Sequence, residues 1–124
     1  MVVLDTSALV RFFTQDIKSK AKQVKLLIET EKIILIPEVV FPELEYVLSG
    51  QYGQQKIILL EGFNFLINKK NIKTTLYVKK AIEIYEKTNL DIADCLILVR
   101  SIKGRLASFD REMLKIKGVN KYWK

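Results

Sequence analysis

The sequence has 124 residues, of which 49% are hydrophobic, so we expect a single domain over residues 1–124 with a substantial buried core. It contains no histidine and one cysteine, Cys95, which excludes Ser-His-Asp catalysis, Cys-His catalysis, ordinary zinc sites and an internal disulfide framework. The net charge of +7 lies mainly at one end, because residues 1–99 carry 13 basic and 12 acidic side chains and residues 100–124 carry 8 and 2.

The first ten residues predict a short buried strand over 2–4 and a helix over 6–13. The apolar run Val-Val-Leu is followed by Asp5, Thr6 and Ser7, all of which can cap a helix. Asp5 therefore lies where a core strand ends and a helix begins. In a parallel sheet, ligand sites collect at this edge.

The rest of the chain also alternates between predicted strands and predicted helices. Periodicity predicts amphipathic helices over 17–28, 54–67 and 78–85, a helix near 40–48 in which Pro42 must lie close to the start or distort it, and a buried helix over 92–102 that Asp91 caps. Short apolar runs predict strands over 33–36, 72–75 and 106–109, with a short helix after Asp110 and a last edge strand over 119–123. Strands alternating with helices predict an α/β fold, with a parallel sheet covered on both faces.

Four acids stand in apolar surroundings, namely Asp5, Glu43, Asp94 and Asp110. Each has a simple structural explanation, because Asp5 and Asp110 could be N-caps, Glu43 could complement a helix dipole and Asp94 could complete a capping arrangement. Together they suggest a cluster, since ionised carboxylates in apolar settings need a partner or a cation. Carboxylate oxygens without histidine suit Mg²⁺ or Mn²⁺.

The segments DTSALV, PELEYVL, LDIADCLILV and ASFDREMLK resemble the four acidic motifs of the PIN domain, most closely of its VapC-type toxin branch. The resemblance covers nearly the whole chain, with the motifs in family order. It implies a three-layer α/β/α sandwich with a short parallel sheet, and a Mg²⁺- or Mn²⁺-dependent endoribonuclease. It also implies an RNA substrate, an antitoxin protein partner and a homodimer.

Carried over by position, the resemblance makes Asp5, Glu43, Asp94 and Asp110 the catalytic, metal-binding acids. Asp5 and Asp94 would ligate directly, and Glu43 and Asp110 would hold a second ion or its waters. The supporting residues are Thr6, Ser7, Asp91 and Ser108. Pro42 departs from the family pattern, which leaves Glu45 as the alternative second acid.

The basic C-terminal end fits a polyanionic substrate, although a solubilising surface would look the same. Four cations lie on or beside the elements that carry Asp94 and Asp110, and we expect them to contact phosphates: Arg100, Lys103, Arg105 and Arg111. Tyr122 and Trp123 either stack on bases or close the edge of the core. No apolar run approaches the roughly 20 residues of a membrane span, and no signal segment is evident, so the expected location is the cytoplasm.

Two other functions fit parts of this pattern. A haloacid-dehalogenase-like phosphatase also begins with a strand and an aspartate, but it needs a second acid two residues later, where this chain has Ser7. A catalytically silent PIN-like domain that binds RNA or protein would share the fold, and the intact acids argue against it.

Overall fold

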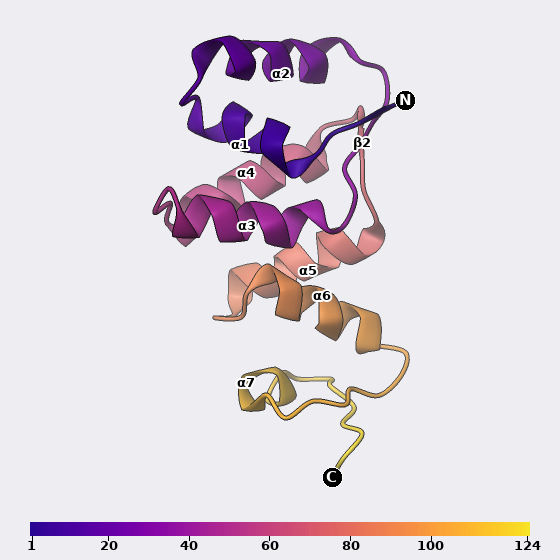
Figure 1. Ribbon diagram of the computed structural model, residues 1–124. Coiled ribbons are helices and arrows are strands. Elements are labelled where there is room, and N and C mark those ends of the chain that lie inside the picture. Colours follow the sequence, from indigo (N-terminus) through magenta and orange to yellow (C-terminus); the bar gives the residue numbers. More distant parts are fainter. The chain divides into compact units, whose positions relative to one another are not determined.

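The predicted strands near 2–4, 33–36 and 72–75 are present, each reduced to two residues in regular pairing. The computed structural model describes residues Met1–Lys124, which divide into two units, Met1–Thr75 and Leu76–Lys124. The first unit contains β1 (Val2–Val3), α1 (Thr6–Thr14), α2 (Lys18–Thr30), β2 (Ile34–Leu35), α3 (Val40–Gly50), α4 (Lys56–Asn68) and β3 (Ile72–Lys73). The second contains α5 (Leu76–Lys87), α6 (Ile92–Ser101) and α7 (Arg111–Leu114) (Figure 1).

The three strands of the first unit form one parallel sheet in the order β1-β2-β3. Val2 pairs with Ile34, and Ile34 pairs with Ile72. Ile34 is fully buried because its strand is central in the sheet. The predicted α/β fold class with a short parallel sheet is confirmed. The carboxyl ends of all three strands therefore lie on one edge, which is where Asp5 follows β1.

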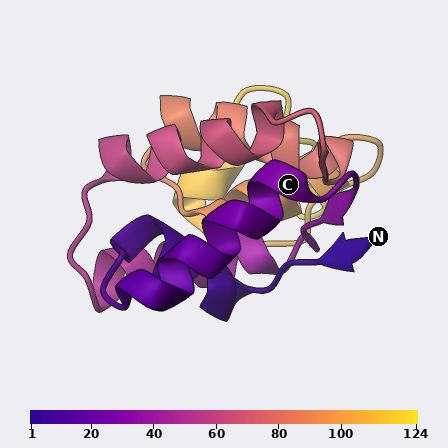
Figure 2. The same ribbon diagram turned by 90° about the horizontal axis from the view of Figure 1, so that it is seen from above.

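The helices of the first unit form its core around the buried face of α1. Helix α1 lies between α2 and α3 (Figure 1) and contacts both. The arrows of β1 and β2, which pair in parallel, lie close together on the side of the N-terminus (Figure 2). Leu9 on α1 is fully buried, and Phe41 on α3 packs against Phe63 on α4 with ring centroids 5.9 Å apart. At the C-terminal end of α2, the side-chain amide of Asn71 donates hydrogen bonds to the carbonyls of Ile28 and Glu31, each at 2.8 Å.

Pro42 is accommodated in the first turn of α3. The helix begins at Val40, so Pro42 is its third residue. The first four backbone N–H groups of a helix have no intrahelical acceptor, so the missing donor of proline costs nothing there. The first of the two predicted alternatives is confirmed, because α3 starts next to Pro42 and needs no interior distortion.

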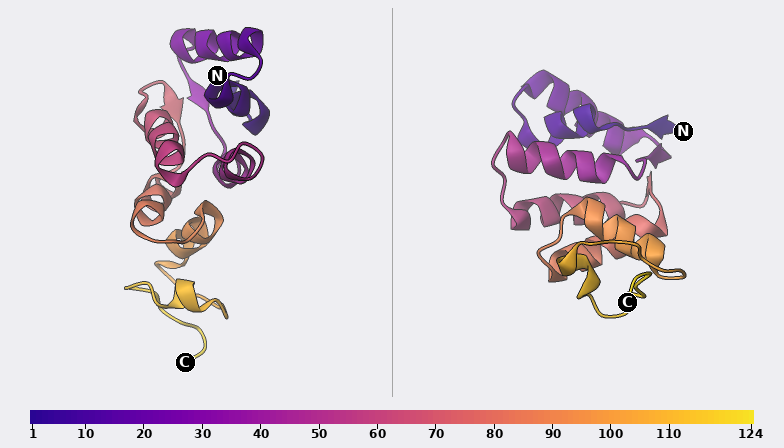
Figure 3. Two further views of the ribbon diagram at one scale, coloured as in Figure 1. Left: turned by 90° about the vertical axis from the view of Figure 1, so that its left-hand side faces the viewer. Right: turned by 60° about the horizontal axis from the view of Figure 1, so that its bottom comes forward.

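The second unit is built on the antiparallel packing of α5 against α6, which lie side by side (Figure 3). The predicted inward face of α5 is confirmed, with Val78, Ala81, Ile82 and Tyr85 buried. The prediction that α6 is buried nearly all round is wrong, because Ile97 is 49% exposed. None of the helices in either unit is both long and apolar enough to cross a membrane.

The strands predicted over 106–109 and 119–123 are also wrong in extent. These segments form only one parallel bridge, between Leu106 and Lys121. The Ser108 hydroxyl accepts a hydrogen bond from the Asp110 backbone N–H at 3.0 Å. A side chain that bonds its own backbone in this way turns the chain and competes with a strand ladder.

Candidate metal and nuclease site

Asp5 joins the end of β1 to the start of α1. It is the N-cap of α1, and its Oδ1 accepts hydrogen bonds from the Ala8 N–H at 3.1 Å and from the Ser7 hydroxyl at 2.9 Å. Leu4, just before it, is buried, whereas Asp5 is exposed. The cap fixes the carboxylate through one oxygen, and Oδ2 remains available to a ligand.

Glu43 is brought to the start of α1 from the first turn of α3. The Thr6 hydroxyl donates a hydrogen bond to Glu43 Oε1 at 2.7 Å, across 37 residues of sequence. Thr6 follows Asp5 directly, so the first two predicted acids of the chain belong to one neighbourhood in the first unit. It is Glu43, and not the alternative Glu45, whose carboxylate Thr6 holds.

Glu38 is a further acid at the carboxyl edge of the sheet that the sequence interpretation missed. It follows β2, and its Oε1 accepts a hydrogen bond from the hydroxyl of Thr75, which follows β3, at 3.1 Å. Its place shortly after a buried strand, like that of Asp5, was the signal that could have identified it. Pro37 before it obscured this signal, because a proline after a strand indicates a turn.

Three acids of the second unit share one electrostatic environment. Partial burial raises the pKa of the Asp94 carboxyl, and the negative charges of Asp91 and Asp110 raise it further. Asp91 is the N-cap of α6, and its Oδ1 accepts from the Asp94 N–H at 2.8 Å. Asp94 therefore lies where negative charge accumulates, and a cation nearby would relieve the repulsion.

Asp110 is the N-cap of α7. Its Oδ1 accepts from the N–H groups of Glu112 at 2.9 Å and Met113 at 3.2 Å. Ser108 holds the backbone of Asp110 from the other side, as described above. Asp110 thus resembles Asp5, since both use a single carboxylate oxygen to cap a helix.

The expectation that these acids lie in apolar surroundings is wrong for three of them. Asp5, Glu43 and Asp110 are exposed, Asp94 is partly buried, and neither unit contains a fully buried charged side chain. The reason is their position at helix starts. Leu4 and Leu44, which flank Asp5 and Glu43, are buried while the carboxylates themselves are exposed, and beside Asp110 even the flanking Phe109 is exposed.

The predicted phosphate-binding cations are all exposed on the second unit. The guanidinium of Arg100 lies 3.8 Å from the centre of the Tyr77 ring, and that of Arg105 lies 4.7 Å from the Tyr122 ring. Lys103 and Arg100 line one shallow hollow between α5 and α6. Stacking on a ring holds a guanidinium in place on the surface.

The candidate acids of each unit offer donors that are compatible with a hard divalent cation. All candidate ligands are carboxylate or hydroxyl oxygens, which suit Mg²⁺ or Mn²⁺ and not softer metals. Partial burial raises the pKa of Asp94, and the charges of Asp91 and Asp110 raise it further, so a nearby cation would favour its ionised form. In neither unit do three or more acidic or cysteine side chains come close enough to enclose an ion by themselves. Mg²⁺ needs few, because it keeps several waters.

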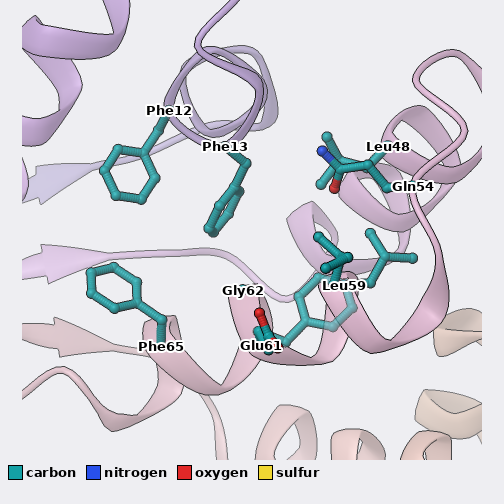
Figure 4. A pocket seen from close by; sticks show the side chains of 10 residues that line it. Phe12, Phe13, Leu48, Gln54, Leu59, Glu61, Gly62 and Phe65 are labelled. Carbon is teal, nitrogen blue, oxygen red and sulfur yellow. The ribbon is translucent and has the colours of Figure 1, made fainter.

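An apolar pocket of about 290 Å³ lies elsewhere in the first unit, between α1 and α4. Figure 4 shows Phe12 and Phe13 on one side of it and Phe65 and Gly62 on the other. Phe12 and Phe65 stack with ring centroids 5.8 Å apart. None of the candidate acids lines this pocket, so it is a separate feature.

Comparison with known proteins gives two matches. A family model described as the PIN domain matches residues 2–119. A VapC ribonuclease of Aquifex aeolicus (strain VF5) is 28% identical over 134 residues, a match that covers 98% of this chain and 98% of that protein.

Proposed function

Because the chain belongs to the PIN domain family, we propose that it is an endoribonuclease that depends on Mg²⁺ or Mn²⁺ and hydrolyses RNA phosphodiester bonds. The observation that carries the proposal is the set of carboxylates at helix starts, among which the pKa of Asp94 is raised by partial burial and by two acidic neighbours. The similarity to a protein named VapC ribonuclease supports the same reaction and substrate. The absence of histidine agrees, because a metal-assisted hydrolysis needs no imidazole base.

The proposed roles follow from how each side chain is held. Asp5 of the first unit and Asp94 of the second would be direct metal ligands, and Glu43 and Asp110 would hold a second ion or its waters. When bound, the divalent cation would polarise the phosphate and make an attacking water more acidic. Thr6 positions Glu43 through its hydrogen bond, and Ser7 likewise orients Asp5.

Two further residues support the second-unit acids. Asp91 fixes the first turn of α6 and adds negative charge beside Asp94. Ser108 fixes the backbone at Asp110. We assign the exposed cations of the second unit to the phosphate backbone of the substrate: Arg100, Lys103, Arg105 and Arg111.

The direct test is cleavage of a labelled RNA with Mg²⁺, with Mn²⁺ and with chelator. Asp5→Asn and Asp94→Asn should each reduce cleavage by at least about 100-fold, because each removes a charge that binds the cation. Glu86→Gln, on an exposed position of α5, is the matched control and should cleave normally. Cleavage in chelator, or cleavage that survives both substitutions, would eliminate the metal-carboxylate mechanism. Binding of RNA without cleavage in the unmodified protein would instead support the catalytically silent alternative.

We further infer a toxin-antitoxin role, with a small antitoxin protein as partner and a homodimer as the assembled state. The name of the Aquifex relative supports the role, and the apolar pocket between α1 and α4 could receive an apolar side chain of a protein partner. Induced expression of the chain alone should stop bacterial growth, and Asp94→Asn should restore it. Sedimentation should show a dimer. Normal growth during expression of active nuclease would contradict the toxin role.

A further inference from the structure

Two segments of the second unit are held together just before Asp110. The Leu106 N–H donates to the carbonyl of Asn120 at 2.7 Å, and the Tyr122 N–H donates to the carbonyl of Leu106 at 2.9 Å. Both segments run in the same direction from this bridge. The residues that follow Leu106 and Lys121 are therefore neighbours, and this brings Phe109 beside Trp123.

Phe109 and Trp123 form a stacked pair on the surface. Their ring centroids are 4.7 Å apart and their planes differ by 10°. Phe109 is 85% exposed and Trp123 is 51% exposed. The alternative that Trp123 closes the edge of the core is wrong, because a core residue would be largely shielded from water.

A further ring and a cation lie beside this pair. Tyr122 packs edge-on against Trp123 with centroids 5.3 Å apart, and Arg105 lies over the Tyr122 ring. Residues 100–124 carry 8 basic and 2 acidic side chains. Large exposed rings beside cations are the combination that binds single-stranded nucleic acid, because bases stack on the rings while the cations meet the phosphates.

We propose that Phe109 and Trp123, here called the aromatic platform, stack on an unpaired base of the RNA substrate and so position the strand at the nuclease site. The proposal deepens the proposed function and rests on it for the identity of the substrate. Phe109 directly precedes Asp110, and adjacent Cα atoms are about 3.8 Å apart. The platform is therefore adjacent in the chain to one of the proposed catalytic acids.

A ring that stacks on every base confers a preference for unpaired RNA and little preference among the bases. A double helix keeps its bases stacked internally and offers no free face to the platform. RNA loops and single strands are thus the expected substrates. An apolar protein partner is the competing occupant, and the net positive charge of this end favours the polyanion.

Trp123 is the only tryptophan in the chain, so its fluorescence reports on the platform directly. The protein is titrated in chelator with a short unstructured RNA, with its duplex form, and with an abasic strand of equal length that carries the same phosphates. We expect strong quenching by the unpaired RNA and little by the other two. Equal quenching by the abasic strand, or no quenching by RNA that binds, would overturn the proposal.

Substitutions distinguish RNA binding by stacking on the aromatic platform from RNA binding by the positive charge of this end of the chain. Phe109→Leu should weaken binding of unpaired RNA, measured by anisotropy of a labelled strand, by about 5- to 100-fold, the range for loss of one base–aromatic stack. Leu26→Ala, which shortens an exposed apolar side chain on α2, is the control and should bind normally. Trp123→Leu provides a second test by anisotropy if Phe109→Leu does not fold.

Three outcomes are decisive against the proposal. RNA affinity that is the same in Phe109→Leu and Leu26→Ala would show that the platform does not bind RNA. Loss of self-association in Phe109→Leu with unchanged RNA affinity would assign the surface to a second copy of the chain. Duplex RNA that binds as tightly as unpaired RNA would contradict the predicted preference. Because every titration is made in chelator, these results do not depend on whether the protein cleaves RNA.

Discussion

The two roles of Asp91, as a helix cap and as a source of repulsion, can be separated by two substitutions. Its Oδ1 accepts a hydrogen bond from the Asp94 N–H at 2.8 Å, and its charge raises the pKa of Asp94. Asparagine caps a helix about as well as aspartate, whereas alanine does not cap and costs about 1 kcal/mol. Asp91→Asn therefore removes the charge alone, and Asp91→Ala removes both.

The expected energies differ in sign. Removing a like charge three residues from Asp94 should raise the free energy of unfolding by about 0.2–0.5 kcal/mol at neutral pH, since both groups are in contact with water. Asp91→Asn should thus be slightly more stable than the unmodified protein. Asp91→Ala should be less stable by roughly 0.5–1 kcal/mol, after loss of the cap. The two variants should differ by about 4 °C in Tm for a domain of this size.

The pH dependence checks the assignment to charge. A carboxyl whose pKa is raised by folding binds more protons in the folded state, so its contribution to stability decreases as pH rises above the ordinary aspartate range. The advantage of Asp91→Asn should therefore be present at neutral pH and disappear in acid, where the carboxyls are protonated. Urea unfolding in chelator at several pH values measures this. Equal destabilisation by both substitutions, or an advantage that persists in acid, would refute the reasoning.

Two other predictions concern the fold. Partial shielding from water raises the pKa of Asp16, but hydrogen bonds from Tyr52 and Thr14 and the charge of Arg11 outweigh this and lower the pKa below its ordinary value. The stabilisation that follows is present above the ordinary aspartate pKa and is lost as pH falls through the lowered pKa. Tyr52→Phe should therefore reduce the urea midpoint at neutral pH but not in strong acid, and an equal reduction at both would contradict this. The single domain predicted over residues 1–124 should unfold in one cooperative transition, with fluorescence of Trp123 and far-ultraviolet circular dichroism giving the same midpoint, whereas two separate midpoints would show two domains.

Local signals in the sequence were sufficient for most of the elements. Strand positions, the helix starts at Asp5 and Asp91, and the inward face of α5 follow from apolar periodicity and capping chemistry, which act between near neighbours. The site motifs were also visible, because each acid lies at such a helix start. The domain family that these motifs resemble is the one whose model matches the chain.

The contacts that were missed are long-range or depend on small competing energies. The hydrogen bond between Thr6 and Glu43 joins residues that are 37 positions apart in the sequence, and no local sequence pattern predicts it. The apolar run 106–109 predicted a strand, but a hydrogen bond from the Asp110 N–H to the Ser108 hydroxyl turns the chain there. The platform of Phe109 and Trp123 depends on that short pairing, so it could not be read from the sequence.

The capping explanation and the catalytic one, which compete when the sequence is read alone, are compatible in the structure. The caps are real for both Asp5 and Asp110, and in each of them the hydrogen bonds involve only Oδ1. A free carboxylate side chain would have to lose rotamer freedom on binding an ion, and a cap removes much of that freedom in advance. Helix capping by these acids is therefore a means of holding one oxygen still so that the other is already placed for a ligand.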